Sequence, residues 1–105
     1  MTTPAANPSQ IPSIMATLVS YEGMFGPYHP HTLGLTTILA IALCESGRTE
    51  EGRPLLQRAL LDLTKHHRRN HPARIRALQA WSDLLSENGD INAALIIQRE
   101  LAAIS

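Results

Sequence analysis

The residues of this chain that could do chemistry are its histidines, its single cysteine and one pair of adjacent glutamates. Among the five histidines, His66, His67 and His71 lie close enough in sequence to suggest a metal site. A structural zinc site needs four ligands, usually including several cysteines, and Cys44 is the only cysteine of the chain. We therefore favour turn histidines over metal ligands, and we predict no metal and no cofactor.

Catalysis has equally little support in the sequence. Cys44 could act as a nucleophile beside a histidine base, but it falls in an apolar run that suits a small core or interface residue. Glu50 and Glu51 look like a pair of catalytic carboxylates, yet they stand where a helix is expected to begin and where negative charge is stabilising. Neither a nucleophile-elbow motif nor a glycine-rich phosphate loop is present. We predict that the protein is not an enzyme.

A basic cluster at residues 65–76 offers an alternative function. No acidic residue occurs between Asp62 and Asp83, so this turn could bind nucleic acid or another anion. The cluster lacks interleaved aromatic residues that would stack on bases, and nine basic and nine acidic residues give the chain a formal net charge of zero. We therefore prefer a solvated turn, or one that meets an acidic partner segment. The cluster consists of Lys65, Arg68, Arg69, Arg74 and Arg76.

These candidate residues belong to a sequence whose plan recurs after forty-two residues. His29-Pro30 returns as His71-Pro72, and Gly47 returns as Gly89. A fixed period of this length indicates stacked copies of one supersecondary unit, which bury apolar surface mainly against their neighbours. Such units serve as binding surfaces more often than as catalysts.

Helical periodicity predicts five helices, with Gly47 and Gly89 as stop signals. The second of them is apolar nearly all round, which indicates a helix that is covered on more than one side. Because the turns within helix pairs are very short, the pairs must be antiparallel hairpins. We expect helices at 11–24, at 31 or 32–46, from a Thr49 cap to about residue 66, at 73–87, and from an Asp90 cap onward.

The repeated phrases resemble those of the tetratricopeptide repeat, in the forty-two-residue form found in kinesin light chains. The first copy carries three of them, GPYHP at 26–30, GRTEE at 47–51 and PLLQRAL at 54–60, while Gly52 departs from the usual alanine. The resemblance implies an all-α fold of about five helices, arranged as a right-handed superhelical stack of antiparallel hairpins. It also implies a concave face, lined by the first helix of each pair, that holds a peptide or partner segment.

The 42-residue recurrence and the resemblance together divide the chain into a flexible lead-in at residues 1–10 and a repeat domain at 11–105. Within the domain we expect a leading helix at 11–28, a first repeat at 29–70 and a second at 71–105. The lead-in has no Lys or Arg, so we predict no secretory signal, and no apolar run is long enough to cross a bilayer. A single cysteine fits a reducing compartment, and we expect a cytoplasmic protein.

In the first helix of each pair, some residues are expected to pack against neighbouring helices of the stack. The candidate binding residues are those on the remaining face of the same helix. By the resemblance, they face the concave groove from the first helix of each pair. The apolar set could instead be buried under the leading helix or a second subunit, and the polar set could be merely solvated. The candidates are Thr37, Ile41 and Cys44 in the first repeat, and Arg76, Gln79 and Asp83 in the second.

The first part of the chain is nearly uncharged. From Met1 to Cys44 the only Asp, Glu, Lys or Arg is Glu22. Helix surfaces that face water normally carry Lys and Glu, and the cores of protein interfaces are depleted in charge. We therefore predict a protein-interaction module that forms a homo-oligomer, with a protein or peptide as its partner and no membrane association.

Overall fold

A computed structural model describes residues 8–104, which form five α-helices and one short 3-10 helix, with no strand in that range. The prediction of an all-helical chain with five helices is therefore confirmed for these residues. The lead-in expected at 1–10 lies largely outside the described residues, and its described part forms η1. The elements are η1 Pro8–Gln10, α1 Ile11–Phe25, α2 Pro30–Glu45, α3 Thr49–His66, α4 Pro72–Glu87 and α5 Ile91–Ile104.

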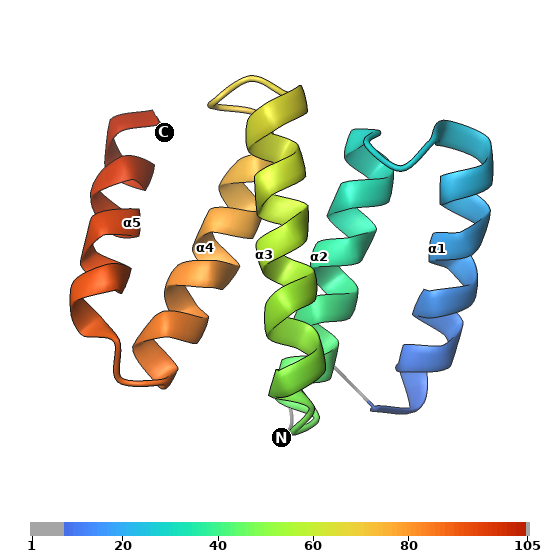
Figure 1. Ribbon diagram of the computed structural model, residues 1–105, viewed down its shortest axis with the longest axis horizontal. Helices are drawn as coiled ribbons and strands as arrows, with labels where there is room; N and C mark the ends of the chain where they lie inside the picture. The colour runs from blue at the N-terminus through green and yellow to red at the C-terminus, as the bar shows by residue number, and fades with distance from the viewer. Residues whose placement is uncertain (1–7, 105) are drawn as a thin grey trace.

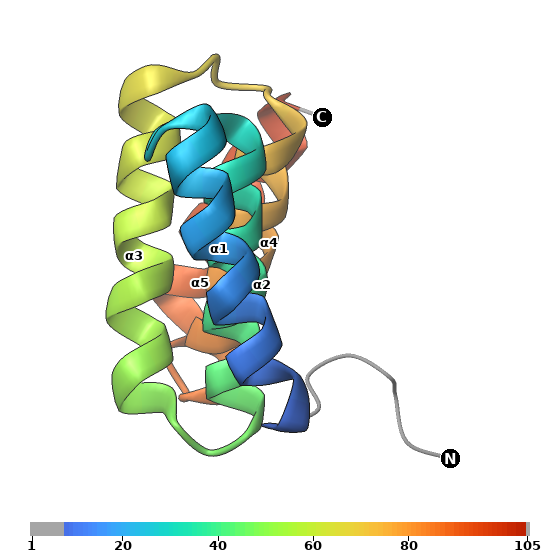
Figure 2. The ribbon, with the colours of Figure 1, turned by 90° about the vertical axis from the view of Figure 1, so that its right-hand side faces the viewer.

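The five helices lie side by side, and successive helices point in opposite directions (Figure 1). Helix α2 packs against α1, α3 and α4, and α4 also packs against α3 and α5. Turned by 90°, the molecule shows α2 and α4 along one side and α3 along the opposite side (Figure 2). Because three helices pack against α2, nearly all of its faces are apolar, as the sequence predicted.

Two clusters of buried side chains hold the helices together. The larger cluster joins α2, α3 and α4, and the leucines at its centre, Leu56 and Leu63, are almost completely buried. The smaller cluster joins α1 to α2 through Ile11, Leu39 and Leu43. Helix α1 buries only Ile11, so it is attached to the rest of the molecule by a narrow strip.

The two His-Pro dipeptides begin α2 and α4 in the same way. In each case the imidazole Nδ1 accepts a hydrogen bond, 3.1 Å long, from the backbone N–H two residues ahead. The proline that follows occupies the first turn, where its missing N–H costs nothing. Burial, with the charges of His67 and Arg68, lowers the pKa of His71 and favours the neutral ring that can accept this bond. The recurrence of the histidine is thus explained by helix capping.

The ends of α2 and α4 are also equivalent. Gly47 and Gly89 have φ angles of 88° and 83°, which residues with a side chain rarely adopt. The residue after each glycine donates its N–H to the carbonyl four positions before the glycine, at 2.8 Å in both copies. This is the Schellman arrangement, which satisfies carbonyls left free at a helix end. The prediction that both glycines stop a helix is confirmed.

The start of α3 differs from the sequence prediction. Thr49 is the first helical residue, not the cap, and Arg48 at the cap position makes no capping hydrogen bond with its side chain. Arg48 instead forms a two-pronged ion pair with Glu51, with Nε–Oε2 and Nη2–Oε1 distances of 2.7 and 2.8 Å. Glu50 and Glu51 lie in the first turn, as their charge predicted.

Candidate functional site

An open groove runs between α2 and α4, which point the same way in Figure 1. Its middle part has a volume of about 270 Å³. It shares Ile41 and Asp83 with a hollow toward the C-terminal ends of the two helices. It shares Ile38 and Arg76 with a wider hollow toward their N-terminal ends. The three hollows therefore form one continuous groove, here called the α2–α4 groove.

All six residues predicted to bind a partner line the α2–α4 groove. The apolar set lies on the α2 wall and the polar set on the α4 wall, so the two predicted sets face a common space. Their role in binding stays a prediction, whereas their common location is a property of the fold. Five surround the middle part, namely Thr37, Ile41, Arg76, Gln79 and Asp83, and Cys44 lines the adjoining hollow.

The six residues differ in what they offer to a ligand. Thr37 is buried, and its hydroxyl donates to the carbonyl of Leu33 at 3.0 Å, so it shapes the wall without presenting a free polar atom. Arg76, Gln79 and Asp83 are exposed. Neither charged residue of this polar set takes part in an ion pair of the described residues. The α4 wall therefore carries charges that are available to a ligand.

Sequence reasoning missed four residues in the middle part of the groove, of which Ala73 is buried. The other three are Gly34, Ile38 and Ala80, and Ile38 is 50% exposed although it is large and apolar. Helical spacing could have found the first two, because they lie three or four residues from Thr37 and Ile41 on the same face. An exposed isoleucine in a hollow suits contact with an apolar group of a partner.

Cys44 is poorly suited to nucleophilic chemistry. Burial raises the pKa of its thiol, and the charges of Glu87 and Glu45 add to this effect, while Arg53 opposes it. A raised pKa keeps the sulfur protonated, and the thiol is the unreactive form. The sulfur also lies where α2 and α3 cross, because a Cβ built on Gly52 would be only 2.6 Å from it. These features favour a packing role.

The histidines of the metal hypothesis have other partners. The His66 ring stacks on Tyr28, with centroids 4.2 Å apart, and Nε2 of His67 lies 2.6 Å from the Tyr28 carbonyl oxygen. His71 caps α4. In the range 8–104, no three or more His, Cys, Asp and Glu residues come together as metal ligands would. The neighbouring His66 and His67 thus join the end of α3 to the turn before α2.

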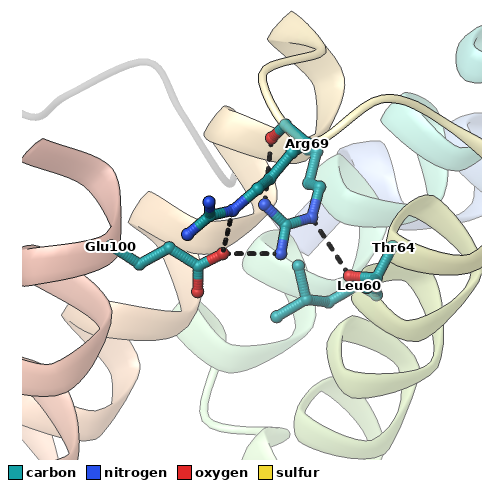
Figure 3. Close-up of polar contacts among 5 residues, drawn as sticks. Leu60, Thr64, Arg69 and Glu100 are labelled. Atoms are coloured by element: carbon teal, nitrogen blue, oxygen red, sulfur yellow. Dashed lines mark hydrogen bonds and ion pairs between the residues drawn. The ribbon is translucent and has the colours of Figure 1, made fainter. Parts of the chain in front are cut away.

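Arg74 is the centre of a buried polar network. Its guanidinium, on a residue only 6% exposed, donates to Thr64 Oγ1 at 3.1 Å, to the Arg69 carbonyl at 2.9 Å and to Glu100 Oε2 at 2.8 Å. Figure 3 shows Thr64 and Glu100 on different helices, and the Arg69 side chain reaches the same Glu100 carboxylate at 3.7 Å. The network ties α4 to α3, to the turn between them and to α5.

The members of the basic cluster at 65–76 therefore lie in different environments and do not form one basic surface. Arg74 is buried, Arg69 shares a carboxylate with it, and Arg76 lines the α2–α4 groove. Lys65, Arg68 and Arg76 are the exposed members that form no ion pair with a described residue. With Arg76 in the groove, the two cations that remain are a weak basis for binding nucleic acid, which depends on neutralising several phosphates together.

Comparison of this chain with known protein families, curated proteins and solved structures finds no match. None of the helices in residues 8–104 combines the length and the apolar character that crossing a membrane requires. What the fold and the site define is an all-helical protein with a groove between two helices that point the same way.

Proposed function

We propose that this chain is a non-enzymatic interaction module of the tetratricopeptide type, which holds a peptide or partner segment in the α2–α4 groove. In this proposal α2–α3 and α4–α5 are two antiparallel hairpins of a right-handed superhelical stack, and α1 corresponds to the second helix of a repeat. The equivalent caps of α2 and α4 support it. A cytoplasmic location belongs to the same proposal, because a lone cysteine fits a reducing compartment.

The observation that carries the proposal is the groove itself. The α2 wall is mainly apolar, with Ile38 and Ile41 accessible, and the α4 wall has the unpaired Arg76 and Asp83. Apolar side chains supply affinity when they are removed from water, and charged groups at the edge fix orientation. An open channel of this kind suits a chain segment better than a compact small molecule, for which enclosed pockets are typical.

Gly34 provides a direct test of the groove, because a Cβ added there meets no atom within 4 Å. We expect Gly34→Trp to fold and to fill the groove with its indole, while Gly34→Ala leaves the groove open. Peptides selected by the native chain from a random twelve-residue phage library should bind Gly34→Ala as before. Their affinity for Gly34→Trp, measured by fluorescence polarisation, should fall more than about tenfold, or about 1.4 kcal/mol.

Two outcomes would refute binding in the groove. One is a library selection that enriches no peptide over uncoated beads. The other is a set of selected peptides that bind Gly34→Trp as tightly as the native chain, while circular dichroism shows that both are equally helical.

We also propose that the chain self-associates through α1. Helix α1 exposes Met15, Val19 and Met24 by half or more, and its only charged residue is Glu22. A weakly charged apolar surface of this kind is typical of the centre of a protein interface.

Val19→Glu should therefore dissociate the oligomer. In sedimentation at micromolar concentration, the native chain should run as a dimer or larger, and Val19→Glu should run near 11.5 kDa. Leu61→Glu is the matched control, because Leu61 is as exposed as Val19 but lies on α3. A native chain that is monomeric at 11.5 kDa would contradict self-association, and dissociation by Leu61→Glu as well would remove the assignment to α1.

A further inference from the structure

The charges of the α2–α4 groove are separated along its length. At the N-terminal ends of the two helices it is lined by one cation, Arg76, and by three histidines, of which His71 favours the neutral form, with no acidic residue. At the C-terminal ends it is lined by three carboxylates and no basic residue. The three carboxylates belong to Glu45, Asp83 and Glu87.

These charges are not neutralised within the described chain. Every ion pair of residues 8–104 lies elsewhere, along α3 or around Glu100. The positive charge of Arg53 opposes the rise in the pKa of Cys44 at the acidic end. Arg53 forms no ion pair with the three carboxylates, and its guanidinium carbon lies over the Trp81 ring, 5.3 Å from the ring centroid. The four charged residues of the groove are exposed, so water solvates them in the free chain and they remain available to ligand groups of opposite charge.

The backbone adds to the same separation. Helices α2 and α4 point the same way, so their positive N-terminal ends lie beside Arg76 and their negative C-terminal ends lie beside the carboxylates (Figure 1). Helix dipoles that are aligned in parallel reinforce one another, where an antiparallel pair would cancel. Between the two ends, Ile38, Ile41 and Ala80 make the surface apolar.

The distance between the basic and acidic ends of the groove sets the length of a ligand that could reach both. Arg76 and Glu87 are eleven residues apart on α4, which corresponds to about 16 Å at a rise of 1.5 Å per residue. An extended peptide advances about 3.3 Å per residue, so about five residues cover this distance.

Building on the function proposed above, we infer that the groove takes an extended peptide segment with segregated charges. Its Lys or Arg side chain meets Glu45, Asp83 and Glu87, its centre is apolar, and an Asp or Glu about five residues away meets Arg76. Three carboxylates in the groove would repel phosphates, so nucleic acid is not the ligand of this surface.

Two synthetic eight-residue peptides of identical composition test this inference. One carries two lysines and two glutamates at opposite ends of an apolar centre, and the other intermixes the same residues. The native chain should bind the segregated peptide at least about tenfold more tightly by fluorescence polarisation, which is about 1.4 kcal/mol. The difference should shrink in 1 M salt, where charges are screened beyond about 3 Å.

A charge-reversed variant tests the acidic end. Glu87→Lys should lose the preference for the segregated peptide and gain affinity for a third peptide with glutamates at both ends. Glu22→Lys makes the same change of charge on α1, outside the groove, and should behave as the native chain does. Glu22 and Glu87 are both exposed, so both variants should fold.

The inference is overturned if the native chain binds the segregated and mixed peptides equally, if it binds neither, or if Glu87→Lys leaves the preference intact. In each of these cases the proposed interaction function survives, provided that peptides from the phage library still lose affinity for Gly34→Trp. Equal binding to native and Gly34→Trp chains would instead refute the proposed function itself.

Discussion

Replacement of Arg74 by methionine should lower the free energy of unfolding by about 3 kcal/mol, at the lower end of the range measured when one member of a buried ion pair is removed. The guanidinium makes three hydrogen bonds that reach α3, the following turn and α5. Methionine fills much of the same volume but donates to none of these acceptors, so Glu100 keeps only the longer contact to Arg69 at 3.7 Å. Urea denaturation at pH 7 followed by circular dichroism measures the loss.

Arg69→Met is the matched control for this prediction. Its side chain is 67% exposed and lies farther from the shared carboxylate, so its removal should cost less than about 1 kcal/mol. The backbone carbonyl that accepts from Arg74 is unchanged in this variant. Equal losses for the two variants would show that the buried position of Arg74 contributes nothing.

The same network predicts a dependence on pH. The hydrogen bond from Arg74 lowers the pKa of Glu100 below its usual 4.5; burial opposes the shift, while the positive charges of Arg74 and Arg69 reinforce it. A lowered pKa means that the folded chain binds this proton less readily than the unfolded chain does. The stabilisation is therefore complete above about 4.5 and is lost as the pH falls through the folded-state pKa. The loss between pH 6 and pH 3 should be smaller in Arg74→Met than in the native chain.

The features that the sequence predicted correctly are those set by local geometry. The glycine stops depend only on backbone φ angles and on hydrogen bonds within six residues, and the repeat marks both Gly47 and Gly89. The predicted residues of α2 and α4 share one space because helical spacing puts each set on one side of its helix, while their role in binding stays a prediction. Thr49 failed as a cap because the helix begins one residue earlier than predicted: the Arg48 carbonyl already accepts from the N–H groups of Glu51 and Gly52.

Features that depend on contacts between distant residues could not be predicted. Arg74 was assigned to a basic surface cluster because its neighbours in sequence are basic. Its acidic partner, Glu100, is twenty-six residues away on α5, and no local pattern connects the two. The segregation of charge in the groove was missed for a similar reason, since Glu45 and Glu87 come together only when α2 and α4 pack in the same direction.

Gly52→Ala should be destabilising by about 2 kcal/mol, although alanine favours a helix by about 1 kcal/mol over glycine. A Cβ at this position would lie 2.6 Å from the Ala40 carbonyl oxygen and 2.6 Å from the Cys44 sulfur. The backbone oxygen cannot move away without separating α2 from α3, and overpacking of this kind typically costs about 1–3 kcal/mol. The glycine at this position is thus explained by a close crossing of α2 and α3.

Gly34→Ala makes the identical chemical change on α2, where the added methyl meets no atom within 4 Å. It should raise the free energy of unfolding by up to about 1 kcal/mol, because only the helix preference of alanine acts there. Urea denaturation of both variants should therefore give changes of opposite sign. In Gly52→Ala, the further substitution Cys44→Ala should restore only part of the loss, because it removes the sulfur and leaves the Ala40 carbonyl in place. A stabilising Gly52→Ala would mean that α2 and α3 are farther apart than the fold described here requires.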